Sequence, residues 1–224
     1  MGTDYQDARQ KMVDNQIRTT DVTSHSVLKA FLTVARENFV PTPLKPLAYI
    51  DSDIQISAGG PDGVARFVME ASPLAKMLQL AQITREHVVL EIGCGSGYCA
   101  ALLSLVAGSV VAVESDSELA DAASERLSEG GYDNVAVVTG ELEKGYAAEG
   151  PYDLIFVNGA VETVPAALFD QLREGGRLVA AVGFGLSAQA HLFVKDGGVV
   201  SSRPAFNISV KPLPGFRKSE EFVF

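Results

Sequence analysis

The chain has few of the residues on which disulfide frameworks and metal sites depend. Its 224 residues include two cysteines, Cys94 and Cys99, and three histidines. Two cysteines are too few for a disulfide framework, and they lack the companion pair that a zinc site needs, so we expect reduced thiols and no metal. The histidines, His25, His87 and His191, lie in no recognisable motif, and we expect them to be structural or exposed.

Positive charge is also scarce. The chain carries 18 basic and 28 acidic side chains, and residues 51–194 hold 20 acidic side chains against 7 basic ones. No run of lysine and arginine is present, so the sequence predicts a protein that does not bind nucleic acid. An acidic excess of this kind is typical of a solvated surface.

Signals for export or membrane insertion are absent. Acidic residues stand near the start, where a secretory signal needs basic and then apolar residues, and Gln6 stands where a myristoylation signal needs Ser or Thr. The longest uncharged stretch, 92–113, contains four glycines and is more typical of a loop, a helix and a strand than of a membrane span. We therefore expect a cytoplasmic protein without membrane contact.

The sequence shows a regular alternation of strand and helix patterns. Short β-branched runs occur at 88–92, 110–114, 135–138, 154–157 and 177–182. Helix-like segments follow at 98–107, 117–129 and 165–173. Near the end, Lys195-Asp196-Gly197-Gly198 joins two more strand-like runs as a hairpin. These patterns predict an α/β fold, a doubly wound, mostly parallel Rossmann-like seven-stranded sheet with a C-terminal antiparallel hairpin.

The sequence also predicts structure for the segments before and after this core. Apolar spacing over the first fifty residues predicts an N-terminal helical layer, and residues 72–81 predict a helix that Ser72 caps. The phenylalanines of the segment 213–224 suggest that it packs on the body. We expect one domain over 1–224, with a helical and substrate-side segment at 1–75 and the Rossmann-like core at 76–224.

The loop after the first core strand indicates a nucleotide-like ligand. Three glycines, Gly93, Gly95 and Gly97, follow Glu91 at every second position and lead into a helix pattern. Glycines there allow close approach of the backbone to a ligand. A dinucleotide fingerprint would need a glycine where Tyr98 stands, and a phosphate loop would need a lysine.

A carboxylate stands at the spacing expected for ribose recognition. Glu114 ends the next strand-like run, 21 residues after Gly93. Together, these features resemble the motifs of class I S-adenosylmethionine-dependent methyltransferases. That resemblance implies a set of donor-binding residues: Glu91, Gly93, Cys94, Gly95, Gly97, Glu114, Ser115, Gly140, Glu141 and Asn158.

The similarity extends to one family. The stretches "MVDNQI", "VLKAFLTVARENFVP", "AYIDSDI", "VVLEIGCGSGYCAAL" and "VPAALFDQLREGGRLVAAVG" resemble the protein-L-isoaspartate O-methyltransferases. Membership implies S-adenosyl-L-methionine as cofactor and isoaspartyl residues in damaged proteins or peptides as methyl acceptors. An isoaspartyl carboxylate is ionised at neutral pH and needs no general base. Base methylation of nucleic acid is disfavoured, because Asn158 is followed by Gly159 and Ala160 and not by paired prolines.

The resemblance fails at one segment. The family carries Thr-Ile-Ser before the helix that precedes the glycine strand, and an ungapped count places that serine at Met69. Met69 can pack in the core or form the apolar floor of a pocket. Ser72 can cap its helix or substitute for the missing hydroxyl. Arg66 can lie on the surface or hold an acceptor carboxylate through two hydrogen bonds, helped by backbone N–H groups of residues 57–63.

Three functions therefore remain open. The first is methylation of isoaspartyl carboxylates with an altered acceptor site, for which Arg66, Met69 and Ser72 are the candidate acceptor-side residues. The second is transfer to a different carboxylate or to a hydroxyl. The third is a binding module that keeps the donor pocket without turnover. The sequence does not predict the oligomeric state.

Overall fold

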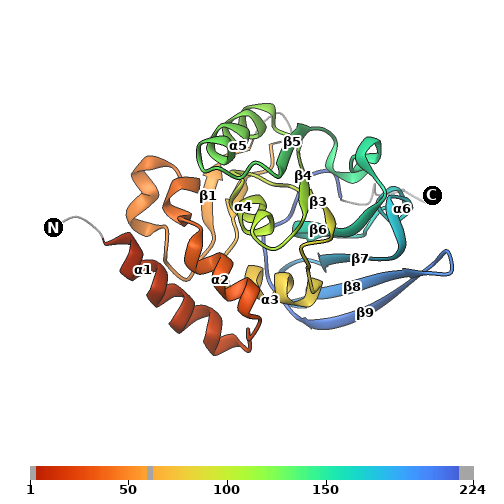
Figure 1. Cartoon of the computed structure of the whole chain (residues 1–224), viewed down its shortest axis with the longest axis horizontal. Helices are drawn as coiled ribbons and strands as arrows, with labels where there is room; N and C mark the ends of the chain where they lie inside the picture. Colours follow the sequence, from red (N-terminus) through yellow and green to blue (C-terminus); the bar gives the residue numbers. More distant parts are fainter. Residues whose placement is uncertain (1–3, 60–62, 217–224) are drawn as a thin grey trace, which may run out of the picture.

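The structure, a computed structural model, describes residues 4–59 and 63–216 of the chain (Figure 1). The helices are α1 (Tyr5–Met12), α2 (His25–Thr33), α3 (Ala71–Ala81), α4 (Tyr98–Ser104), α5 (Ser117–Glu129) and α6 (Ala166–Asp170). The strands are β1 (Ile54–Ser57), β2 (Arg66–Val68), β3 (Val88–Ile92), β4 (Ser109–Glu114), β5 (Val135–Thr139), β6 (Tyr152–Val161), β7 (Leu172–Val182), β8 (Gln189–Asp196) and β9 (Val199–Asn207).

A mixed sheet of seven strands in the order β5-β4-β3-β6-β7-β8-β9 forms the centre of the fold. Pairing is parallel from β5 to β7 and antiparallel from β7 to β9. The predicted fold class, including the terminal hairpin, is confirmed. The chain moves outward in one direction from β3 to β5 and returns to the other side of β3 at β6, so a crevice is expected at the carboxyl ends of β3 and β6.

Each face of the sheet packs on its own apolar cluster. Along β3, Val89 joins a cluster shared with α1 to α4, whereas Leu90 and Ile92 join a cluster shared with α6. This alternation follows from the two-residue period of a strand. Figure 1 shows α1, α2 and α3 grouped together beside the sheet. The predicted N-terminal helical layer thus shares an apolar core with the sheet.

The start of α3 differs from the prediction. The helix begins at Ala71 with Glu70 as its N-cap residue, so the prediction that Ser72 caps it is wrong. The chain leaves β2 at Val68 and enters the helix almost at once, which places Ser72 inside the first turn. Its hydroxyl instead donates to the Thr20 hydroxyl across 3.0 Å.

The helix predicted over 165–173 is shorter than expected. Helix α6 ends at Asp170, and β7 begins at Leu172. Tyr152 N–H donates to the Gln171 carbonyl across 2.8 Å, and Tyr152 pairs with Leu172. Pairing with the start of β6 therefore holds residues 171 and 172 in the sheet.

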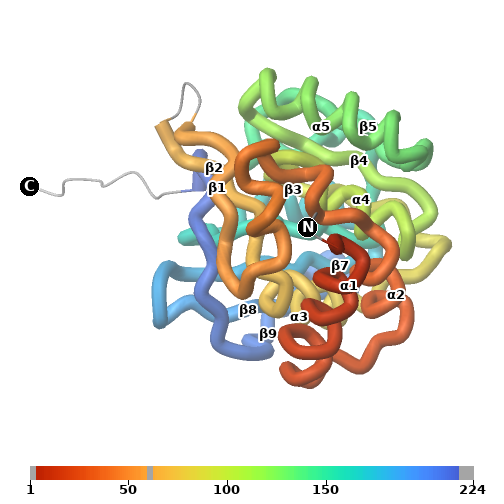
Figure 2. The backbone as a smooth tube through the Cα atoms, turned by 90° about the vertical axis from the view of Figure 1, so that its left-hand side faces the viewer, coloured from red at the N-terminus to blue at the C-terminus, as the bar shows by residue number. Residues whose placement is uncertain are grey.

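The chain after β9 returns to the centre of the molecule. Ala160 N–H donates to the Lys211 carbonyl at 2.8 Å, and Leu213 N–H donates to the Ala160 carbonyl at 2.9 Å. Figure 2 shows this segment rising beside β1 and β2. Leu213 and Phe216 are buried, in agreement with the expected packing, and residues 217–224 lie outside the described part.

Within the described residues, no helix is both long and apolar enough to cross a membrane. The same residues contain no group of three or more His, Cys, Asp or Glu side chains suited to a metal ion.

Candidate functional site

Residues at the carboxyl ends of β3 and β6 line a small cavity, together with residues of β2 and of the segment after β9. Its volume is about 20 Å³, which is room for one or two water molecules. Five of the predicted site residues line it: Arg66, Met69, Gly93, Gly95 and Asn158. The cavity thus lies at the crevice that the strand order predicts.

The glycine loop after β3 adopts a backbone that side chains would disturb. Gly93 has a φ of +81°, and a Cβ there would lie 2.6 Å from Leu213 Cδ2. Gly95 has a φ of +54°, and its N–H donates to Glu114 Oε2 across 2.9 Å. Left-handed backbone favours glycine, so the loop geometry and the close approach of the C-terminal segment explain these two residues.

Glu114 joins the loop to the end of β4. Its side chain is fully buried. Oε1 accepts from Ser115 N–H at 2.9 Å and from Asp116 N–H at 3.2 Å, while Oε2 accepts from Gly95. Backbone donors from two segments therefore hold this carboxylate beside Gly95, which lines the cavity.

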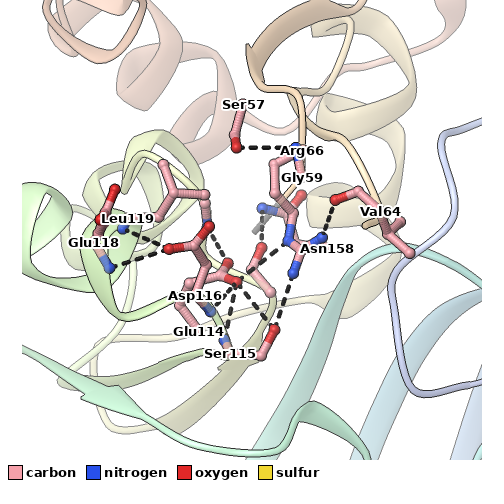
Figure 3. A network of polar contacts seen from close by, with 12 residues as sticks. Ser57, Gly59, Val64, Arg66, Glu114, Ser115, Asp116, Glu118, Leu119 and Asn158 are labelled. Carbon is pink, nitrogen blue, oxygen red and sulfur yellow. Dashed lines mark hydrogen bonds and ion pairs between the residues drawn. The ribbon is translucent and has the colours of Figure 1, made fainter. Parts of the chain in front are cut away.

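Arg66 occupies the other side of the Glu114 carboxylate. Its Nε lies 3.3 Å from Glu114 Oε1, and its Nη2 donates to Ser115 Oγ at 2.9 Å (Figure 3). The Arg66 side chain is only 3% exposed. The structure thus places Arg66 against the predicted ribose-binding carboxylate. The guanidinium offsets the negative charge of that carboxylate, and the Arg66 side chain lines the cavity.

Glu91 lies beneath the loop and not in the cavity lining. Asn158 Nδ2 donates to Glu91 Oε1 at 3.0 Å and to the Gly93 carbonyl at 3.3 Å. Burial raises the pKa of Glu91 from its ordinary value to about 8. Between Phe156 and Ala160 the pairing of β6 with β7 shifts register, and such a bulge re-aims side chains. Asn158 therefore links the buried carboxyl group to the cavity wall.

The raised pKa of Glu91 predicts a pH-dependent stability. Between about pH 4.5 and pH 8 the folded chain keeps the Glu91 proton while the unfolded chain releases it, so this group lowers the free energy of unfolding as pH rises. The Glu91→Gln variant removes that titration. We expect its free energy of unfolding relative to the unsubstituted chain to rise by about 3 kcal/mol from pH 5 to pH 8.

Urea unfolding at pH 5, 6.5 and 8 measures this difference. The control is Glu129→Gln, because Glu129 is exposed near the end of α5. A Glu91→Gln difference that stays constant across the three pH values would contradict the prediction.

Met69 forms an apolar part of the wall. It is 6% exposed, and its carbonyl accepts from Arg36 Nη2 at 2.9 Å. Arg36 is fully buried, donates from Nε to the Ala48 carbonyl at 2.7 Å and lies over the Tyr98 ring. Sequence reasoning gave Arg36 no role. A single arginine between the buried Val34 and Phe39 is the signal that could have indicated one.

The other predicted residues lie around the cavity or away from it. Ser72 contacts Thr20, and Glu141 is exposed and forms an ion pair with Lys144 at 2.6 Å. Cys94 is buried in the loop, and Gly140 N–H donates to the Glu114 carbonyl at 3.0 Å. Of the segment 57–63, residues 60–62 lie outside the described part.

The histidines do not enter the cavity. His87 Nδ1 accepts from Thr84 N–H at 3.3 Å, and His191 Nδ1 lies 3.0 Å from Ser202 Oγ. His25 is exposed at the start of α2. The cavity therefore offers no imidazole as a general base.

Comparison with known proteins identifies the family. The model of the protein-L-isoaspartate(D-aspartate) O-methyltransferase family matches residues 7–215. The chain belongs to the protein-L-isoaspartate O-methyltransferase family. Similar relatives include the protein-L-isoaspartate O-methyltransferase of Koribacter versatilis, 41% identical over 78% of this chain and 76% of that protein. That of Methanoculleus marisnigri is 38% identical over 92% of this chain and 91% of that protein.

Solved structures agree with this assignment. A protein-L-isoaspartate O-methyltransferase superimposes with a TM-score of 0.80 at 29% identity, covering 92% of this chain, which spans 66% of that one. A Plasmodium falciparum protein described as a putative member, in complex with S-adenosyl-L-homocysteine, has a TM-score of 0.72 at 17% identity over 94% of this chain and 98% of its own. The second likeness concerns the fold alone.

This family of methyltransferases depends on S-adenosylmethionine, and the site has suitable residues for that donor. Glu114 presents a buried carboxylate at the end of β4, as ribose hydroxyls require, and Gly95 beside it lacks a side chain. The Arg66 guanidinium, which lines the cavity, lies against the same carboxylate.

Proposed function

We propose that this chain transfers a methyl group from S-adenosylmethionine to isoaspartyl carboxylates in damaged proteins or peptides, with an acceptor wall in which Met69 replaces a hydroxyl. The carrying observation is the buried carboxylate of Glu114 held against Gly95 beside the cavity that Met69 lines. Bound S-adenosylmethionine supplies an electrophilic methyl group on a sulfonium. The cytoplasmic location and the lack of nucleic-acid binding stay predictions from composition.

The chain's own residues would position the reactants. In this proposal Glu114 binds the donor ribose, and the loop that carries Gly93 and Gly95 lies next to the bound ribose. Met69 would exclude water from the acceptor side, which strengthens the attraction between an anion and a sulfonium. Proximity and orientation then supply the rate enhancement.

A carboxylate acceptor suits this cavity better than a hydroxyl. A hydroxyl must lose a proton during transfer and needs a base close by. No histidine lines the cavity, and Asp53, the acidic residue in the lining among the described residues, accepts from Glu70 N–H at 2.9 Å. A carboxylate ionised at neutral pH does not require that help.

The direct test is a methyl-transfer assay with a matched pair of peptides. The chain is incubated with labelled donor and with peptides that differ only in an isoaspartyl or an aspartyl residue. We expect a base-labile methyl ester on the isoaspartyl peptide and none above background on the aspartyl peptide. No ester on the isoaspartyl peptide, together with calorimetric binding of S-adenosylhomocysteine, would favour the alternative of a different acceptor or of binding without turnover.

A further inference from the structure

Lys211 is a cation at the cavity whose charge no described acidic residue neutralises. Among the described residues, the cavity lining contains three charged side chains, Asp53, Arg66 and Lys211. Arg66 forms its ion pair with Glu114, whereas Lys211 forms no ion pair with any residue that the structure describes. The site thus has one lysine that lies outside any described ion pair, beside the place where we propose that an anion binds.

The backbone fixes where this lysine stands. The Lys211 carbonyl accepts from Ala160 N–H at 2.8 Å, and Pro212 pairs with Ala160 as an isolated bridge. Asn158 and Gly159, which line the cavity, immediately precede Ala160. Lys211 is therefore attached to the carboxyl end of β6, although it lies far from that strand in sequence.

The ammonium group of Lys211 lies near an aromatic ring of the same lining. Lys211 Nζ lies 5.4 Å from the centroid of the Phe67 ring, on β2, and Phe67 also lines the cavity. A cation over an aromatic face at this distance is attracted but stays available to a stronger anionic partner. Lys211 is exposed, so its ammonium remains hydrated at the rim.

Acidic groups near this rim would oppose the binding of an anionic acceptor. Asp53 lines the cavity, and the nearby Asp51 and Asp53 raise the pKa of Glu70 together with its burial. These acidic groups repel an incoming carboxylate. Because Arg66 is neutralised by Glu114, Lys211 is the cation left to offset that repulsion among the described lining residues.

We propose that Lys211 binds the acceptor carboxylate and sets the preference for an anionic acceptor, an inference that rests on the proposed function. Methyl transfer cancels the negative charge of the carboxylate, so a lysine that pairs with it stabilises the bound substrate at least as much as the transition state. Lys211 is therefore a substrate-binding residue and not a catalytic one. The neutral ester loses the ion pair and leaves more readily.

The test compares steady-state kinetics of Lys211→Met, Lys211→Arg and Lys76→Met with the isoaspartyl peptide. Lys76 is the matched control, because its ammonium lies 4.5 Å from the Phe206 ring centroid and away from the cavity lining. We expect Lys211→Met to raise the KM for the peptide about 10- to 100-fold with kcat unchanged, as for loss of a charged hydrogen bond. Lys211→Arg and Lys76→Met should keep the KM of the unsubstituted chain.

Added salt and the donor affinity provide two further readouts. Salt should raise the peptide KM of the unsubstituted chain more than that of Lys211→Met, because it screens an exposed ion pair. The Kd of S-adenosylhomocysteine should be the same in both. An unchanged peptide KM in Lys211→Met, or a raised Kd with an unchanged KM, overturns the role of Lys211 while the proposed function stands. No ester from the unsubstituted chain overturns both.

Discussion

Replacing Glu114 with alanine is expected to weaken donor binding on the order of 100-fold or more and to lower the free energy of unfolding by about 3–5 kcal/mol. The substitution removes the acceptor for the N–H groups of Gly95, Ser115 and Asp116. It also leaves the Arg66 guanidinium, which is 3% exposed, without its carboxylate. Hydrogen bonds to a charged group contribute about 1.5–3 kcal/mol each, so losing two ribose contacts weakens the donor on the order of 100-fold or more.

The double variant Glu114→Ala/Arg66→Met separates stability from binding. Replacing both members of a buried ion pair with apolar groups is often neutral, so the stability lost by removing the partner of Arg66 should return, while the N–H groups of Gly95, Ser115 and Asp116 still lack their acceptor. Donor binding should not return, because the carboxylate is still absent. Urea unfolding and calorimetric titration with S-adenosylhomocysteine measure the two effects. A double variant that binds this ligand as tightly as the unsubstituted chain would show that Glu114 does not hold the donor.

The sheet and its loop could be predicted because their signals are local. β-Branched runs give the parallel strands, Gly93 directly follows β3, and Glu114 is the last residue of β4. Parallel neighbours end at the same edge of a sheet, so a spacing of 21 residues predicts that the loop and the carboxylate meet. The structure places Glu114 Oε2 2.9 Å from Gly95 N.

The acceptor side could not be predicted because its contacts are long-range. Arg66 belongs to a strand of three residues, paired with β1 through an irregular register, and reaches a carboxylate 48 positions away. A short strand with little alternation leaves no periodic signal. From the sequence, Arg66 could lie on the surface or hold an acceptor carboxylate, whereas the structure buries it against Glu114.

Lys211 and Arg36 were missed for a related reason. Lys211 reaches the cavity only because the chain after β9 returns to Ala160, and Arg36 reaches the Met69 carbonyl from the N-terminal layer. Neither path follows from local propensity, since loop routes depend on tertiary packing. The departure at Met69 was visible in the sequence, but the residues that compensate for it required the fold.

Gly95→Val is the second change with a large expected effect, and it should remove donor binding altogether. Gly95 has a φ of +54°, a conformation that a β-branched residue strongly disfavours. A Cβ at this position would lie 3.1 Å from Ile56 Cδ1, on β1, and branched methyl groups would extend into the cavity that the glycine lines. Calorimetry with S-adenosylhomocysteine should detect no binding, and the isoaspartyl peptide should receive no methyl group.

Gly131→Val is the control that distinguishes loss of ligand binding from a loss of stability caused by backbone strain. Gly131 has a φ of +72°, and nothing lies within 4 Å of a Cβ built there. Strained backbone of this kind costs about 1–3 kcal/mol, so both variants should lose stability by similar amounts in urea unfolding. Of the two variants, only Gly95→Val should lose the ligand. Gly95 lines the cavity and donates its N–H to Glu114, whereas Gly131 does neither. Retained affinity in a folded Gly95→Val variant would place the donor pocket elsewhere.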